Sequence, residues 1–172
     1  MAFKGLFIGI DRYDSPEINW LGCANRDAKA LHALFTDTLG GETMLLTDEQ
    51  ATVAAIRERF EQLAACDPDD VVVIAFSGHG TETHELVAHD TDPYDLARTT
   101  IPLTTLGEWC SRISSRRLLI VLDCCFSGGM GAKALQVEGA ARDIQSVEGK
   151  LNQIGGEGRG YTRKSSVLTH TF

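Results

Sequence analysis

Two short segments of the chain combine residue types that can carry out covalent chemistry. One is the run FSGHG at residues 76–80, and the other is DCCFSGG at residues 123–129. A histidine beside a cysteine can take the thiol proton, and the thiolate that results attacks carbonyl carbon. We therefore expect His79 to act as a general base and either Cys124 or Cys125 to act as a nucleophile.

Each reactive segment follows an apolar run that predicts a buried strand, at residues 71–76 and 118–122. The glycines and small residues that follow predict a loop after each strand. The carboxyl ends of parallel strands lie at one edge of a sheet, so the histidine and the cysteine can meet there. In such a loop, Gly78 and Gly80 would let the backbone approach a substrate, and the N–H groups of Gly80 and of the cysteine would stabilise an oxyanion.

The remaining patterns predict a regular alternation of strands and helices. Two further strands are expected at residues 3–10 and 43–46. Helices are expected at residues 24–39, from a cap at Thr52 to about residue 65, and from residue 104 or 105 to 113. Residues 90–99 are polar and rich in turn-forming types. This order is typical of an α/β domain with a mainly parallel sheet.

Composition excludes several classes of function. The chain has 172 residues, enough for one domain, and a net charge of −8, which disfavours binding to nucleic acid and suits a cationic ligand. No apolar run approaches the roughly 20 residues that cross a bilayer. The N-terminus lacks the features of a signal peptide, and the chain has no CxxC pair that would indicate a metal site. We expect a cytoplasmic protein that contacts neither nucleic acid nor a membrane.

Together, the two reactive segments resemble the caspase-like clan of cysteine peptidases (clan CD, peptidase C14-like). The branch that they resemble most contains metacaspases, orthocaspases and bacterial caspase-like domains. The strand GLFIGI at residues 5–10 and the segment LGCANRDA at residues 21–28 add to the resemblance, which covers residues 3–128. It implies the caspase-haemoglobinase fold, a three-layer α/β arrangement with a mainly parallel central sheet, of which this chain would contain the large-subunit portion.

The resemblance also implies a role for individual residues. The general base would be His79, the nucleophile would be Cys125 and not Cys124, and the oxyanion donors would be the backbone N–H groups of Gly80 and Cys125. The family usually has a histidine after the nucleophile, where this chain has Phe126. We expect that difference to change the packing of the loop more than its chemistry.

Metacaspase-like enzymes bind a basic P1 residue, the residue on the amino side of the cleaved bond, in an acidic pocket. Asp27 and Asp123 match the acidic positions, and Ser77 is expected to line the same pocket. A pair of carboxylates complements a guanidinium group. The resemblance thus implies an endopeptidase that cleaves after Arg, and then Lys, through an acyl-enzyme. Two structural alternatives stay open, a helix N-terminal charge for Asp27 and a strand-end cap for Asp123.

The resemblance divides the chain into three parts. Residues 1–129 would form the catalytic large-subunit portion, residues 130–164 a flexible linker between subunits, and residues 165–172 the start of the small-subunit portion. We therefore expect a fragment of a longer protein. Its partners would be a protein or peptide substrate with a basic P1 residue and fused or associated sensor domains, in a bacterial signalling or defence protein.

No cofactor is implied, although calcium activates some metacaspases. Asp90, Asp92 and Asp95 lack the spacing of a calcium loop and are predicted to form a solvated turn. Two other functions stay open. One is a catalytically inactive caspase-like interaction module, and the other is a thiol hydrolase or acyltransferase that acts on small molecules.

Overall fold

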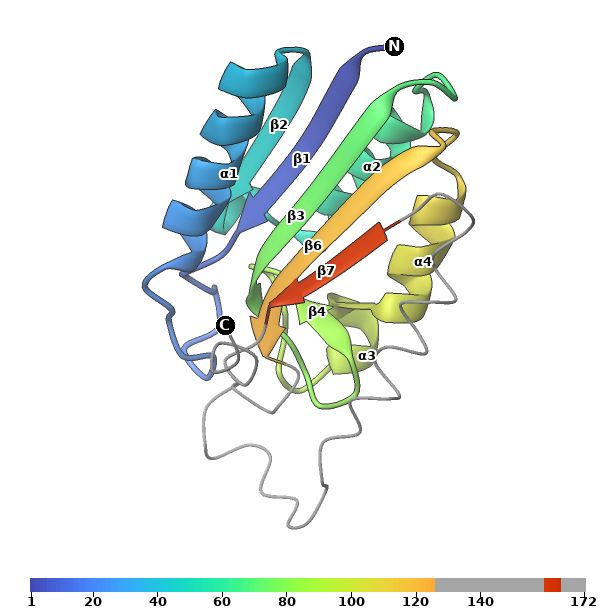
Figure 1. Cartoon of the computed structure of the whole chain (residues 1–172). Coiled ribbons are helices and arrows are strands. Elements are labelled where there is room, and N and C mark those ends of the chain that lie inside the picture. The colour runs from blue at the N-terminus through green and yellow to red at the C-terminus, as the bar shows by residue number, and fades with distance from the viewer. Residues whose placement is uncertain (126–159, 165–172) are drawn as a thin grey trace.

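A computed structural model describes residues 1–125 and 160–164 of the chain (Figure 1). Its centre is a parallel five-stranded sheet with the strand order β2-β1-β3-β6-β7. These strands are β1 (Phe3–Gly9), β2 (Glu42–Thr47), β3 (Val71–His79), β6 (Arg117–Cys125) and β7 (Gly160–Lys164). A second, antiparallel sheet pairs β4 (Glu85–Val87) with β5 (Thr100–Pro102).

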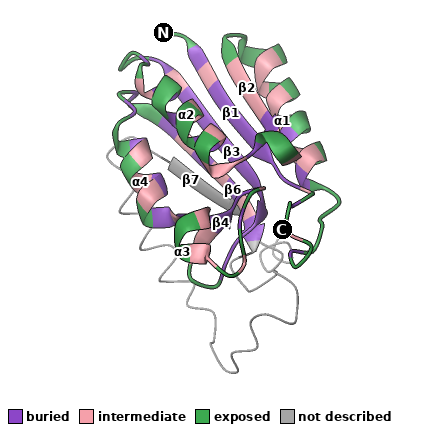
Figure 2. Cartoon of the chain, turned by 180° about the vertical axis from the view of Figure 1, so that it is seen from behind, coloured by how far each residue is buried: buried purple, intermediate pink, exposed green. Residues whose placement is uncertain are grey.

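Helices cover both faces of the central sheet. α1 (Ala24–Leu39) lies on one face, whereas α2 (Val53–Ala64) and α4 (Leu103–Ser111) lie on the other (Figures 1 and 2). A 3-10 helix at Asp48–Gln50 follows β2, and the short helix α3 (Leu96–Thr99) precedes β5. The predicted three-layer α/β arrangement with a parallel sheet is confirmed.

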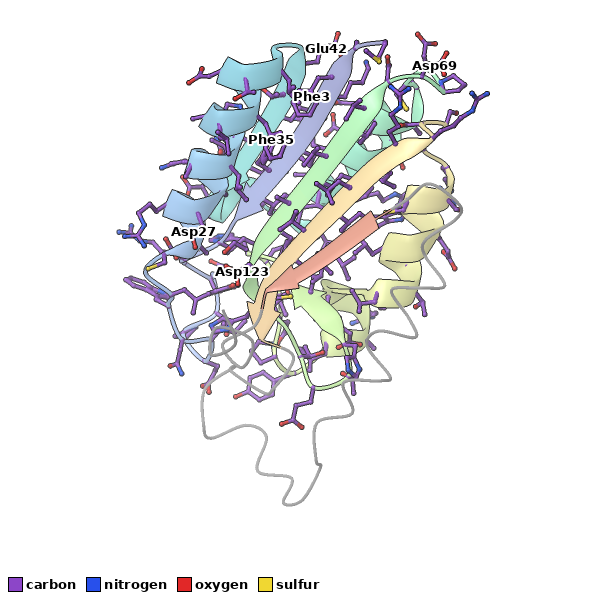
Figure 3. The ribbon with its side chains drawn as sticks, viewed as in Figure 1. Phe3, Asp27, Phe35, Glu42, Asp69 and Asp123 are labelled. Atoms are coloured by element: carbon purple, nitrogen blue, oxygen red, sulfur yellow. The ribbon has the colours of Figure 1, made fainter. Side chains whose placement is uncertain are left out.

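The strands are apolar on both faces because each face packs against a helical layer. Leu6, Ile74 and Ile120 belong to the larger core, which also contains side chains of α2 and α4. Phe3 and Val73 belong to a smaller cluster that packs against α1. There the ring of Phe3 stacks on that of Phe35 with 5.7 Å between centroids (Figure 3).

β3 and β6 do not end where the sequence predicts. Instead of giving way to loops after Phe76 and Leu122, the strands continue to His79 and Cys125 and pair with each other throughout. Parallel pairing satisfies the backbone groups of small residues as well as those of large ones, so glycine does not force a strand end here. A Cβ atom at Gly78 would lie 3.1 Å from the Phe76 ring and 3.2 Å from the Tyr13 hydroxyl. The missing side chain at Gly78 therefore makes room for Phe76 and Tyr13, whereas the expected approach of this backbone to a substrate stays a prediction.

Two other segments also differ from the prediction. The turn-rich residues 90–99 include α3, and the pairing of β4 with β5 was not predicted because strands of three residues carry little periodic signal. Residues 160–164, the end of the expected linker, form β7 beside β6. The rest of that linker and residues 165–172 lie outside the described residues. Among the helices that the structure describes, none has the length and apolar character needed to cross a bilayer.

Candidate active site

The carboxyl edge of the sheet gathers the residues with reactive or charged side chains. In the parallel pairing of β3 with β6, His79 lies opposite Cys125, and Ser77 lies opposite Asp123. Four positions that the sequence analysis selected therefore meet on two neighbouring strands. These positions lie within the paired strands themselves and not in loops that follow the strands.

The first of the two adjacent cysteines, Cys124, is part of the hydrophobic core. Cys124 is only 3% exposed and belongs to the larger core, together with Ile120 and Leu122 of the same strand. The next residue of β6, Cys125, is the register partner of His79.

The His79 ring is held in one orientation. The side chain is 6% exposed, and its Nε2 atom lies 2.8 Å from the backbone oxygen of Asn19. A carbonyl oxygen only accepts hydrogen bonds, so Nε2 carries the proton and Nδ1 is the basic nitrogen of the neutral ring. Burial lowers the pKa of His79 below its usual 6.5, and the weaker opposing effect of the Asn19 bond does not reverse this shift. The ring is thus neutral, with a free base at Nδ1, at neutral pH.

Tyr13 contacts the same histidine through its hydroxyl and its ring. Its hydroxyl accepts a 2.9 Å hydrogen bond from the backbone N–H of His79 and donates a 3.2 Å bond to the oxygen of Ile10. The two rings pack with 5.1 Å between their centroids. Burial raises the pKa of Tyr13, so its hydroxyl keeps the proton that it donates.

A carboxylate anchors the loop that presents Tyr13 and Asn19. Asp48 accepts 2.9 Å hydrogen bonds from the backbone N–H groups of Asp11 and Arg12, and a 2.6 Å bond from the Asn25 side chain. Burial alone would raise the pKa of Asp48, but these hydrogen bonds outweigh it and hold the pKa below its usual range. The ionised carboxylate therefore fixes the start of this loop.

The end of the same loop is fixed where α1 begins. The N-cap residue Cys23 makes no side-chain capping bond. The Asp11 carboxylate instead accepts bonds from the N–H groups of Ala24 at 2.8 Å and Asn25 at 3.2 Å. These bonds satisfy N–H groups of the first helical turn, which have no acceptor within the helix itself. The loop between β1 and α1 is thus tied down at both ends.

Sequence reasoning missed Tyr13, Asn19 and Asp48. Asn19 acts through its main-chain oxygen, which every residue type has, so no residue pattern marks it. Tyr13 meets His79 across 66 residues of sequence, and Asp48 meets Asp11 across 37. Only the folded chain brings these groups together.

The residues expected to bind a basic side chain lie at this edge too. Asp123 is partly buried within β6, and Ser77 is buried beside it on β3. Asp27 lies in the first turn of α1 and its side chain is 37% exposed, 3.9 Å from the Arg26 guanidinium. Figure 3 shows Asp27 and Asp123 at the same end of the molecule.

The structure also bears on the two structural alternatives for these carboxylates. The position of Asp27 in the first helical turn agrees with a helix N-terminal charge. Asp123 does not cap a strand end, because β6 continues past it to Cys125. A Cβ atom at Gly9 would lie 2.5 Å from the Ala24 oxygen. The absence of a side chain at Gly9 therefore lets the start of α1 approach the sheet edge.

Gly80 follows directly after β3 and forms an isolated antiparallel bridge with Leu86 of β4. The small sheet therefore adjoins the candidate active site. The three carboxylates considered for calcium each accept a hydrogen bond from another part of the protein. Asp90 accepts a bond from the Val53 N–H, Asp92 from the Tyr94 N–H, and Asp95 from the Arg98 side chain. No group of three or more metal-binding side chains occurs within residues 1–125 or 160–164.

Comparison with known proteins identifies the family. The profile of the caspase domain family, Peptidase C14, matches residues 3–167. The chain belongs to this family. It is 27% identical to Metacaspase-3 of Trypanosoma cruzi (strain CL Brener) over 175 residues, which cover 89% of this chain and 48% of that protein. The chain therefore spans about half the length of this curated relative.

Solved structures show the same fold. A protein from Geobacter sulfurreducens matches 73% of this chain and 51% of its own with a TM-score of 0.59 and 18% identity. The structure of pro-sf-caspase-1 matches 81% of this chain and 53% of its own with a TM-score of 0.53 and 15% identity. The caspase-like α/β fold implied by the sequence is thereby confirmed, and the chain is a caspase-like peptidase domain.

Proposed function

We propose that this caspase-like domain is a cysteine endopeptidase that cleaves peptide bonds after Arg and, less readily, after Lys. The observation that carries the proposal is the state of His79. Its Nε2 proton is bound by the Asn19 carbonyl, and its Nδ1 remains basic on a strand paired in register with Cys125. Membership of a family of cysteine peptidases supports the same chemistry.

In the proposed reaction, Nδ1 of His79 takes the proton from the Cys125 thiol, and the thiolate attacks the substrate carbonyl carbon. The oxyanion accepts hydrogen bonds from the N–H groups of Gly80 and Cys125. The C–N bond then breaks, and His79 gives its proton to the leaving amine, which leaves a thioester on Cys125. Water, deprotonated by His79, hydrolyses the thioester and regenerates the thiol. This sequence requires no cofactor.

Specificity would come from carboxylates at the same edge. Asp123 precedes Cys125 by two positions and shares its face of β6, so it is suited to hold the charged end of a P1 side chain. Ser77, opposite Asp123, would add a hydroxyl to this pocket, and Asp27 would add a second negative charge from α1. Two carboxylates favour the bidentate guanidinium of Arg over the ammonium of Lys.

The cellular setting is a second part of the proposal. The chain spans about half of its curated relative, which agrees with a catalytic portion that is fused to, or associates with, further domains. We infer a cytoplasmic protease module whose partner domains sense a signal, as in bacterial signalling or defence. A comparison of its activity with and without calcium tests whether a metal ion regulates it.

A thiol-reactive peptide probe with Arg at P1 tests the catalytic assignment. The wild-type chain is expected to form a covalent adduct, which peptide mass spectrometry locates on Cys125. The adduct should be absent in Cys125→Ala and present in the matched control Cys124→Ala. Labelling of Cys124 instead would contradict the assignment.

The same preparation distinguishes the alternatives. A peptide library that is cleaved preferentially after Asp would overturn the proposed specificity. Complete lack of labelling and of cleavage would favour the inactive interaction module. Turnover of simple esters without a basic P1 group would favour the small-molecule thiol hydrolase.

A further inference from the structure

An exposed aromatic residue directly follows, in the sequence, a residue that contacts the proposed general base. Trp20 is 66% exposed, and the next residue, Leu21, is 36% exposed. The residue before Trp20 is Asn19, whose backbone oxygen holds the His79 ring at 2.8 Å. Single exposed apolar residues are common on protein surfaces. This one is attached directly to the group that orients the proposed general base.

The Trp20 side chain is also held in place before any ligand arrives. The Arg12 guanidinium lies 5.4 Å from the centroid of the indole ring, which is a cation–π contact. The backbone N–H of Leu21 donates a 2.8 Å hydrogen bond to the oxygen of Asp11. Asp48 binds the N–H groups of Asp11 and Arg12, so the support of the ring is itself anchored. A preorganised aromatic surface loses little conformational entropy on binding.

We propose that Trp20 and Leu21 form a subsite that binds a bulky apolar side chain of the peptide substrate, next to the basic P1 residue. This inference rests on the proposed endopeptidase function. Asp27 and Asp123 supply negative charge at the sheet edge, and Trp20 supplies an apolar surface one residue along the chain from the Asn19 oxygen that holds His79. The substrate that matches both features carries a basic residue flanked by an aromatic or large aliphatic one.

Kinetics with quenched fluorescent peptides test the subsite. Each peptide has Arg at P1 and either Gly or Phe at one of the neighbouring positions, with Gly at the others. At one position, Phe should raise kcat/KM of the wild-type chain about 10-fold over Gly, the effect expected when part of an aromatic ring leaves water. Trp20→Ala should remove this preference, so that the Phe and Gly peptides give the same kcat/KM, whereas Trp20→Phe should keep most of it.

The matched control is Leu39→Ala, which removes another exposed apolar side chain. Leu39 is 51% exposed and ends α1 at the opposite edge of the sheet. It should leave both the Gly and the Phe peptides unchanged. A Phe preference that survives in Trp20→Ala, or no preference at any position in the wild-type chain, would overturn the subsite.

A binding measurement separates this inference from the proposed reaction. The same peptides are titrated against Cys125→Ala, and tryptophan fluorescence is recorded. The chain has two tryptophans, and the other, Trp109, packs on Phe60 with 5.3 Å between rings. A saturable change that requires Phe in the peptide, and that disappears when Trp20→Phe is added, supports the subsite even if no peptide is cleaved. Absence of such a change overturns it even if cleavage after Arg is observed.

Discussion

Both ends of the central sheet contain a buried hydroxyl group that joins two backbone groups. At the amino end, Ser115 donates a 2.7 Å hydrogen bond to the Asp70 oxygen and accepts a 3.0 Å bond from the Arg117 N–H. At the carboxyl end, Tyr13 donates to the Ile10 oxygen and accepts from the His79 N–H. The two hydroxyls make the same kinds of bond, yet their surroundings differ.

At the amino end, the charged groups are used within the structure. The buried Asp70 carboxylate accepts hydrogen bonds from the N–H groups of Ala2 at 2.6 Å and Asp67 at 3.1 Å, and these bonds lower its pKa. At the carboxyl end, burial lowers the pKa of His79, and Trp20 stays exposed. A buried hydroxyl thus links backbone groups at both ends, and at the carboxyl end one of these groups is the backbone N–H of the proposed general base.

The largest expected effect on activity distinguishes the two adjacent cysteines at the carboxyl end of the sheet. Cys125→Ala should lower kcat/KM for Arg peptides by about 10³-fold or more, because it removes the nucleophile. Cys124→Ala should retain activity but lose about 1 kcal/mol of unfolding free energy, because it removes core packing. Peptide kinetics and urea denaturation measure the two effects. An inactive Cys124→Ala protein of unchanged stability would reverse the assignment.

The next largest effect concerns the carboxylates. Asp123→Asn should lower kcat/KM for Arg peptides by about 100-fold, since it removes the partly buried partner of the guanidinium. Asp27→Asn should cost about 10-fold, because its more exposed carboxylate already lies near Arg26. Asp37→Asn, an exposed change farther along α1, is the control and should have no effect. Equal losses in all three variants would point to general electrostatics and not to a pocket.

The two hydroxyl groups provide the most direct comparison of the sheet ends. Tyr13→Phe and Ser115→Ala each leave a buried donor and acceptor without a partner, so each should lower the unfolding free energy by about 1–3 kcal/mol. Only Tyr13→Phe should also lower kcat, by roughly 3–10-fold, since it loosens His79. Denaturation together with kinetics under native conditions measures both. Similar effects of the two variants on kcat would remove the proposed distinction.

The smallest effect is a dependence of stability on pH. Burial lowers the pKa of His79 in the folded state, so between that pKa and the unfolded value near 6.5 the unfolded chain binds more protons. Stability should therefore rise with pH across this window and fall on acidification. The loss between about pH 7.5 and pH 5.5 should be larger for the wild-type chain than for His79→Gln. Identical pH profiles would show that His79 is not a buried neutral base.

Much of the fold was predictable because its signals are local. Apolar runs marked the buried strands, and residues 24–39 have the bounds of α1. The extension of β3 and β6 was not predictable, because it depends on pairing between strands far apart in sequence. β4 and β5 were missed because each has only three residues.

The sequence by itself determined which residue types can react and which strands carry them, since both are written in short segments. Residue pattern alone left Cys124 and Cys125 open, and the family resemblance selected Cys125. Only the tertiary structure showed Cys124 in the core, because the face of a strand that is buried depends on the layers packed against it. It also decided which nitrogen of His79 is basic, because the carbonyl that binds the other lies 60 residues away along the chain.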